Sequence, residues 1–118
     1  MASTLQQGQL AEEKAGAFLR QQGLQLIERN YRRPFGEIDL IAREGETLVF
    51  VEVRKRSHLG FGDGAESIDW RKQRRLRRTA EAFMQQRRWN GPARFDVLVL
   101  DASDRIEWLQ DAIQDAWS

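Results

Sequence analysis

The chain has 118 residues, of which 41% are hydrophobic and 31% are charged, and its net charge is +1. The length predicts a single domain over residues 1–118, the apolar content is too high for a disordered chain, and no apolar run approaches the roughly 20 residues of a membrane-spanning helix. The absence of cysteine excludes disulfides and thiolate zinc sites, and the polar first residues predict no secretory signal, which together fit a cytoplasmic location.

The predicted elements follow one another in the order α-β-β-β-α-β-β. The first helix has apolar residues at helical spacing and ends at Gly23, and the second ends at Asn90-Gly91-Pro92, because glycine and proline stop helices. Strands are recognised by β-branched or aromatic residues with period-two alternation. The predicted ranges are 4–22 and 68–88 for the helices and 24–30, 37–43, 47–54, 94–101 and 105–109 for the strands.

The connections between these elements indicate how the strands pair. Residues 32–36 form a predicted turn, and Glu44-Gly45-Glu46 separates two strands as in a hairpin, so the first three strands form an antiparallel meander. A glycine-rich loop at 57–64 leads to the second helix, and the strand–helix–strand connection predicts a right-handed parallel crossover. The expected fold is an α/β mixed sheet flanked by helices, with one more helical turn near the end of the chain.

Acidic residues gather on the two strands of the predicted hairpin. Because side chains alternate between the faces of a strand, Glu37, Asp39 and Ile41 share one face of the first strand. Glu52 lies on the corresponding face of the next strand. A two-residue turn at Gly45-Glu46 would place Asp39 opposite Glu52, whereas a turn one residue earlier would place Glu37 there. Both registers bring carboxylates together.

Neighbouring carboxylates need a counter-ion, because burying them unpaired costs several kcal/mol. Mg²⁺ or Mn²⁺ fits this need, since hard cations take oxygen ligands and keep waters and phosphate oxygens in their remaining positions. The alternative is a structural ion cluster in which Arg54 or a neighbouring arginine pairs with the carboxylates. The spacing alone leaves both interpretations open.

Three segments form a recognisable pattern: Gly36-Glu37-Ile38-Asp39-Leu40-Ile41-Ala42-Arg43, Leu48-Val49-Phe50-Val51-Glu52-Val53 and Arg71-Lys72-Gln73-Arg74-Arg75-Leu76. They closely resemble the YraN family, a group related to Holliday-junction resolvases within the PD-(D/E)XK nuclease superfamily. The resemblance covers nearly the whole chain and extends to Glu12, Ala15, Leu19, Asn30, Phe95 and Asp96.

The resemblance implies a restriction-endonuclease-like fold in which Asp39 and Glu52 are metal ligands and the backbone carbonyl of Val53 completes the site. It also implies that Glu12 approaches from the first helix, and that Lys72 and Gln73 are the members of the second helix nearest the metal. The candidate catalytic residues are Glu12, Glu37, Asp39, Glu52, Arg54 and Lys55.

The chain departs from the family pattern two residues after Glu52. The family usually has lysine there, but this chain has Arg54, followed by Lys55. The lysine of the superfamily is thought to orient or deprotonate the attacking water, whereas arginine keeps its proton at physiological pH. Period-two alternation turns Lys55 to the other face unless a bulge shifts the register. Three outcomes stay open. Arg54 replaces the lysine and gives a reduced cleavage rate, the side chain of Lys55 moves into the site, or the protein binds nucleic acid without cleaving it.

The net charge is unevenly distributed along the chain. Residues 54–88 hold eleven basic and four acidic residues, and the rest holds eight basic and fourteen acidic residues. This split predicts a surface for a polyanion beside an acidic site, with salt-sensitive binding to phosphates; the alternative is a solvated helix face. The candidate nucleic-acid-binding residues are Arg56, Arg71, Lys72, Gln73, Arg74, Arg75 and Arg78.

The aromatic residues and the lone histidine receive structural interpretations. We expect Trp70, Trp89, Trp108 and Trp117 to pack in the core or against a partner rather than to stack on bases. His58 lies in the glycine-rich loop, and one histidine cannot build a zinc site, so we assign it no role in catalysis.

The hypothesis that follows is a metal-dependent endonuclease that hydrolyses structured or branched DNA, with Mg²⁺ or Mn²⁺ as cofactor. The alternative is a catalytically weak or inactive nucleic-acid-binding protein of the same fold, favoured by Arg54. A third possibility is an interaction protein whose basic helix meets an acidic partner. Resolvase-like enzymes make symmetric cuts, so a homodimer is compatible with the first hypothesis, and no membrane association is expected.

Overall fold

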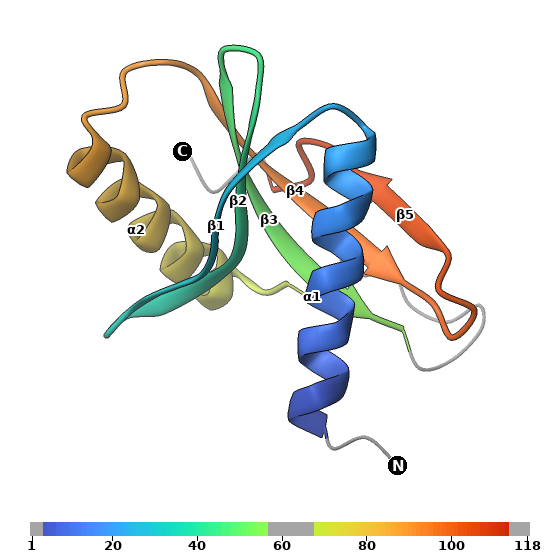
Figure 1. Ribbon diagram of the computed structural model, residues 1–118. Helices are drawn as coiled ribbons and strands as arrows, with labels where there is room; N and C mark the ends of the chain where they lie inside the picture. The colour runs from blue at the N-terminus through green and yellow to red at the C-terminus, as the bar shows by residue number, and fades with distance from the viewer. Residues whose placement is uncertain (1–3, 57–67, 114–118) are drawn as a thin grey trace.

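The computed structural model describes residues 4–56 and 68–113 as one five-stranded sheet with a helix on each face (Figure 1). The elements are α1 (Thr4–Gln21), β1 (Gln25–Arg33), β2 (Gly36–Glu44), β3 (Thr47–Lys55), α2 (Trp70–Arg87), β4 (Ala93–Leu100) and β5 (Ile106–Leu109). This confirms the predicted α/β fold and its element order. Neither described helix is long and apolar enough to cross a membrane.

The strands lie in the order β1-β2-β3-β4-β5, and every neighbouring pair is antiparallel except β3 and β4. The parallel pair is the one joined through α2, as the predicted crossover requires. The predicted end of the first strand at Asn30 was wrong. Arg32 and Arg33 continue β1 by pairing with Glu37 and Gly36, so the turn is shorter than expected.

The sheet buries a separate hydrophobic cluster on each face. Leu76, Ala80 and Phe83 of α2 pack on one face, where Phe83 meets the rings of Tyr31 and Phe50 edge to face. Helix α1 covers the other face with its buried stripe Ala11, Ala15 and Leu19. Both stripes have the helical spacing expected for one apolar face, and together they hold the sheet between two layers.

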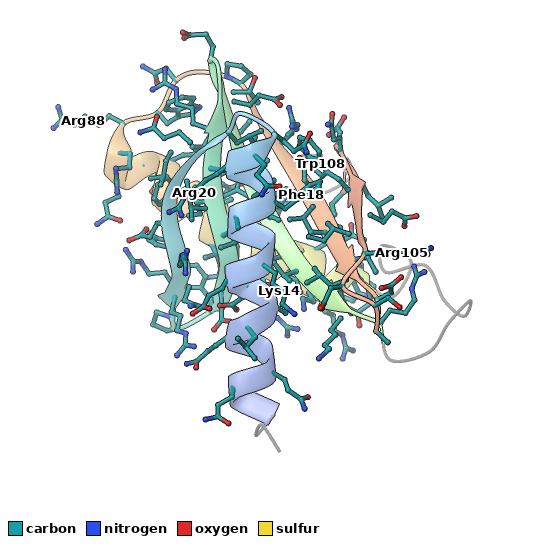
Figure 2. The ribbon with its side chains drawn as sticks, turned by 45° about the vertical axis from the view of Figure 1, so that its right-hand side comes forward. Lys14, Phe18, Arg20, Arg88, Arg105 and Trp108 are labelled. Atoms are coloured by element: carbon teal, nitrogen blue, oxygen red, sulfur yellow. The ribbon has the colours of Figure 1, made fainter. Side chains whose placement is uncertain are left out.

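Three of the predictions for tryptophan can be compared with the structure. Trp108 packs edge to face against Phe18 at 5.9 Å between ring centroids, and Figure 2 shows the two side by side. Trp89 packs against the α2-side cluster and donates from Nε1 to the carbonyl of Pro92 at 3.1 Å. Packing is therefore confirmed for these two residues. Core packing is wrong for Trp70, which is 60% exposed, and its packing against a partner stays a prediction.

Some predictions fall outside the described residues. The glycine-rich loop at 57–64, including His58, and Trp117 lie there. Residues 110–111 form a turn, and residues 114–118 of the expected last helical turn are not described. The second helix begins later than predicted, with Asp69 as its N-cap, because the Asp69 carboxylate accepts the Lys72 backbone N–H at 2.9 Å.

At Gly36, β2 lies close to α2. A β-carbon at this position would lie 2.5 Å from Oγ1 of Thr79 and 3.0 Å from the backbone oxygen of Arg75. A β-carbon there therefore requires the Thr79 side chain or the backbone of α2 to shift. Gly36 therefore sets the spacing of the layer that carries Lys72 and Arg75.

Replacing Gly36 with alanine is expected to lower the free energy of unfolding by about 1 to 3 kcal/mol, the usual cost of overpacking. Gly8→Ala is the matched control, because a β-carbon there meets nothing within 4 Å in the middle of α1. Alanine at that position is expected to raise stability by roughly 0.5 to 1 kcal/mol. Urea unfolding of both variants measures the difference, and equal stability of the two would contradict the close approach.

Candidate functional site

The hairpin of β2 and β3 has the first of the two predicted registers. Its pairs run from Glu44 and Thr47 at the turn to Leu40 and Val51, which places Asp39 across from Glu52. The paired region ends at Leu40. Beyond that point the backbone N–H of Val53 donates to Oδ2 of Asp39 at 2.8 Å, so the carboxylate takes the place of a backbone acceptor.

The predicted alternation along β2 needs a correction. Ile38 and Ile41 both belong to the α2-side cluster, whereas Leu40 belongs to the α1-side cluster. Strict alternation is therefore interrupted between Ile38 and Leu40. Across the sheet, Asn30 has a φ of 52° and lies between the pairs that flank this point, so β1 is locally distorted as well. Asp39 sits at the interruption with its carboxylate against the backbone of β3.

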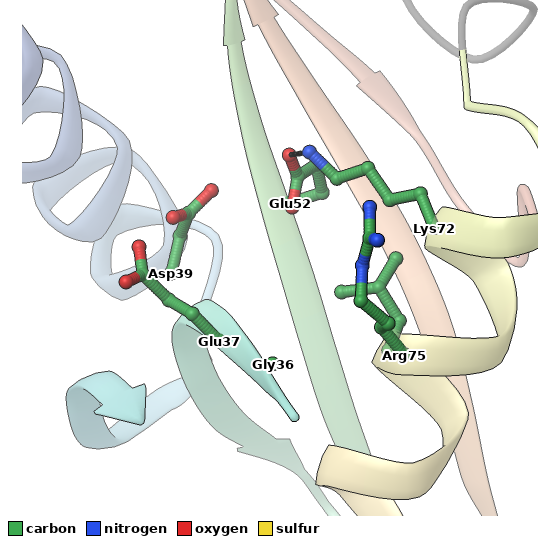
Figure 3. A pocket seen from close by; sticks show the side chains of 7 residues that line it. Gly36, Glu37, Asp39, Glu52, Lys72 and Arg75 are labelled. Atoms are coloured by element: carbon green, nitrogen blue, oxygen red, sulfur yellow. Dashed lines mark hydrogen bonds and ion pairs between the residues drawn. The ribbon is translucent and has the colours of Figure 1, made fainter. Parts of the chain in front are cut away.

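The acidic ends of β2 and β3 face α2 across a pocket of about 220 Å³ (Figure 3). The volume would hold several waters at about 30 Å³ each. Three of the predicted acidic residues and two of the predicted basic residues meet here, one set from the strands and the other from the helix. The lining residues are Gly36, Glu37, Asp39, Glu52, Lys72, Arg75 and Leu76.

Glu52 is buried and has cationic neighbours. It is 7% exposed, and its Oε1 lies 2.7 Å from Nζ of Lys72 and 3.7 Å from Nε of Arg54. The ion pair predicted as the structural alternative is thus present, but its shorter contact comes from a lysine of α2. Nε of Arg54 is buried and makes no hydrogen bond in the described structure, so Glu52 accepts no hydrogen bond from it.

Asp39 lies beside other carboxylates without a cation of its own. The pKa of Asp39 is raised from 3.8 to about 7, first by burial and then by the charge of Glu52, against the lowering effect of the Val53 N–H. The charges of Glu12 and Glu37 also raise the pKa of Asp39. No cationic side chain in residues 4–56 and 68–113 pairs with this carboxyl. Asp39 is therefore the carboxyl of the pocket that lacks a cationic partner among the described residues, and it is only partly ionised at neutral pH.

The donor set fits a hard divalent cation that keeps most of its waters. Within the described ranges no group of three or more His, Asp or Glu side chains is gathered closely enough to hold a metal ion. Asp39 and Glu52 would therefore be the two carboxylate ligands, which is the usual number for Mg²⁺. Glu12 and Glu37 act on Asp39 through their charge, and Glu37 is itself paired with Arg32 at 2.9 Å.

The remaining predicted residues lie around the pocket rather than in it. Lys55 is exposed and does not line it, and Arg56 is 3.9 Å from the Glu107 carboxylate on β5. Gln73 turns back to the carbonyl of Ile68 at 3.0 Å. On the outer side of α2, Arg71 and Arg74 lie over the ring of Trp70, and Arg78 lies over Phe35.

Sequence reasoning missed the contact between Lys72 and Glu52 and the pocket-lining positions of Gly36 and Leu76. The signal for the helix residues was present. Lys72 lies four residues before the buried Leu76, and Arg75 lies four residues before the buried Thr79, so both project toward the sheet. Nothing in the spacing identified Gly36, because its role is a close approach between two elements.

Comparison with known proteins gives consistent results over most of the chain. The model of the uncharacterised protein family UPF0102 matches residues 11–100. The chain is 48% identical over 105 residues to a UPF0102 protein of Shewanella amazonensis, covering 89% of this chain and 96% of the relative. It is 51% identical over 109 residues to one of Methylobacillus flagellatus, covering 91% and 96%. The names of these relatives state a family and no activity.

Proposed function

The chain belongs to the uncharacterised protein family UPF0102, the YraN family whose motifs it carries, and we propose that it is a metal-dependent endonuclease acting on structured or branched DNA. One observation supports this most strongly. The carboxylates of β2 and β3, of which Asp39 has no cationic partner among the described residues, line the same pocket as the cations of α2, which suits a hydrated cation on one side and a phosphate on the other.

Asp39 and Glu52 would hold the cation, with the backbone carbonyl of Val53 as a further ligand. Bound there, Mg²⁺ or Mn²⁺ would lower the pKa of a water and neutralise charge on the scissile phosphate. The fixed position of the Asp39 carboxylate supports this role, because the Val53 N–H holds Oδ2 and leaves the other oxygen unrestrained by that bond. The ligand is therefore oriented before anything binds.

The cationic side of the pocket would receive the phosphodiester. Lys72 reaches Glu52 at 2.7 Å and Arg75 lines the same space, so two positive charges are available to the phosphate oxygens. The rest of the basic residues on α2 would hold the flanking backbone, and such contacts are sensitive to salt and indifferent to base sequence.

Lys72 would replace the lysine that this chain lacks after Glu52. As an ammonium paired with Glu52, Lys72 can orient an attacking water and neutralise the charge that develops at the phosphate. Among the described residues, Lys72 is the lysine that lines the pocket. Its position on α2 rather than on β3 brings the amine to the same carboxylate from across the pocket.

Lys72→Ala is expected to lower the rate of metal-dependent cleavage about a hundredfold or more, the usual loss when one positioned donor to the transition state is removed. Arg54→Lys is expected to change the rate by less than about threefold, and Lys55→Ala serves as an exposed control outside the pocket. Rates are measured on a nicked duplex in saturating Mn²⁺ after a melting check. A large gain from Arg54→Lys together with an unaffected Lys72→Ala would assign the role to position 54 instead.

The proposed function is tested by incubating the protein with linear, nicked and four-way DNA in Mg²⁺ or Mn²⁺ and with a chelator. We expect cleavage of the nicked or branched substrates that the chelator abolishes. The combined Arg74→Glu, Arg75→Glu and Arg78→Glu variant should bind DNA more weakly and with a smaller dependence on salt. Unchanged affinity of this variant, or cleavage that is indifferent to the metal, would reject the proposal.

The alternative function is a nucleic-acid-binding protein with weak or no cleavage. The close pair between Lys72 and Glu52 favours it, because a cation already occupies one side of the second carboxylate. Strong salt-dependent binding without nicking in either metal would support this alternative.

A further inference from the structure

Trp70, the first residue of α2, is the most exposed large hydrophobic side chain among the described residues. It is 60% exposed, compared with 48% for Leu10 on α1. Aromatic side chains normally contribute to folding by burial, so this indole contributes little to the core. Its exposure excludes core packing, so the ring is accessible to a binding partner.

Two arginines accompany the exposed ring. Cζ of Arg71 lies 5.7 Å and Cζ of Arg74 lies 5.5 Å from the ring centroid, within the range of cation–π contacts. Both arginines are exposed, and neither forms an ion pair with a carboxylate of residues 4–56 or 68–113. Trp70, Arg71 and Arg74 therefore form an aromatic surface flanked by positive charge, called here the Trp70 platform.

The chemistry of the Trp70 platform matches a nucleotide. An indole face stacks on any nucleobase, and neighbouring guanidinium groups can meet the phosphates on either side. An acidic protein segment would use the charges but would gain little from the flat face. A base in a continuous duplex is already stacked on both sides, so only an unpaired base can present its face to the ring.

The Trp70 platform and the pocket occupy opposite sides of the same helical turn. Lys72 and Arg75 line the pocket, whereas the platform residues lie on the outer side of α2. A helix with its side chains is about 10 Å across. A strand that passes from the pocket to the platform therefore spans a few nucleotides.

We infer that the Trp70 platform binds an unpaired base a few nucleotides from the phosphodiester held in the pocket. The pocket part of this inference rests on the proposed function, but the stacking itself does not. The site would thereby select nucleic acid with a short single-stranded segment next to a duplex, such as a flap or an opened junction arm. Stacking does not read base identity, so the preference is for the unpaired state and not for a sequence.

The test measures affinity by fluorescence anisotropy in a chelator, so that cleavage does not interfere. The probes are a blunt duplex, the same duplex with a short single-stranded flap, and that flap with abasic positions. We expect Trp70→Ala to bind the flap about tenfold more weakly than the wild type and to bind the blunt duplex equally well. The wild type should lose a similar factor on the abasic flap, and Trp70→Ala should lose little more.

Trp70→Tyr, which keeps a stacking face, should retain flap binding within about threefold. Leu10→Ala is the matched control, because it removes a comparably exposed side chain from the opposite face of the sheet. Melting curves show whether each variant is folded. Equal flap binding by Trp70→Ala and the wild type, or an equal loss on the blunt duplex and the flap, would overturn the inference.

The outcomes separate this inference from the proposed function. Base-dependent flap binding without any metal-dependent cleavage would support the Trp70 platform and reject the nuclease. Cleavage that is unaffected by Trp70→Ala, with equal affinity for normal and abasic flaps, would do the reverse. Absence of salt-sensitive binding to every probe would reject both.

Discussion

Asp39→Asn is expected to abolish metal-dependent cleavage and, without metal, to make the protein more stable at alkaline pH. Asparagine keeps an oxygen that can accept the Val53 N–H at 2.8 Å but loses the charge that would bind the cation. Metal ions supply several kcal/mol of charge stabilisation at a phosphate, and about 1.4 kcal/mol corresponds to a factor of ten. We therefore expect the cleavage rate to fall about a thousandfold.

The stability effect follows from the raised pKa of Asp39, about 7 in the folded protein compared with 3.8 ordinarily. Folding favours the protonated carboxyl, so its contribution is fully present below about pH 4 and is lost as pH rises through 7. Asparagine does not titrate and shows no such loss. The expected advantage of the variant is a few kcal/mol at about pH 8 and little near pH 4, because one unit of pKa corresponds to about 1.4 kcal/mol.

Urea unfolding in a chelator at both pH values measures this advantage. Glu46→Gln is the control, because the Glu46 side chain is 91% exposed in the turn of the same hairpin and should change stability little at either pH. A destabilised Asp39→Asn variant at about pH 8 would show that burial and the neighbouring carboxylates do not destabilise the charged form of Asp39. Retained cleavage would show that the metal does not require this carboxylate.

Asp96→Ala is expected to cause the largest loss of stability of any substitution considered. Asp96 is completely buried and accepts bonds from Nε of Arg94 at 3.0 Å, Nε1 of Trp108 at 2.9 Å and the backbone N–H of Asp111 at 2.9 Å. Its removal leaves three donors without their acceptor, one of them charged. Breaking a buried ion pair costs about 3 to 5 kcal/mol, a large part of the 5 to 15 kcal/mol typical of a domain.

Asp101→Ala is the matched control for this prediction. Asp101 follows the same strand and also accepts two backbone N–H groups, those of Ser103 at 2.8 Å and Arg105 at 2.9 Å. It is less buried and binds no cation in the described structure, so we expect a loss of about 1 kcal/mol. Urea unfolding near neutral pH distinguishes the two. Equal losses would mean that Arg94 finds another partner, such as Glu44, which it already contacts at 2.8 Å.

Local patterns were sufficient to predict the hairpin and to limit its register to two possibilities, but not to choose between them or to give the exact position of its carboxylates. Gly45 has a φ of 58°, a conformation that suits glycine, and the two-residue turn that it allows sets the pairing of β2 and β3. The interruption at Asp39 was not predictable. It coincides with the distorted Asn30 on the neighbouring strand, and no spacing within β2 signals it.

The side chains of α2 show a similar limit. Its buried stripe is readable from the helical period, and the pocket-facing Lys72 and Arg75 share that period. The partner chosen by Lys72 is not readable, because it depends on how closely α2 lies to the sheet, a distance set by Gly36. The exposure of Trp70 likewise depends on what the fold leaves uncovered, and tryptophan in general is more often packed.

A crystal soaked in Mn²⁺ tests most directly whether the acidic half of the pocket is a cation site. We expect an anomalous peak about 2 Å from carboxylate oxygens of both Asp39 and Glu52, with the amine of Lys72 displaced from its 2.7 Å contact with Glu52. Density that shows no peak between the two carboxylates, with Lys72 still bound to Glu52, would contradict the proposed metal site.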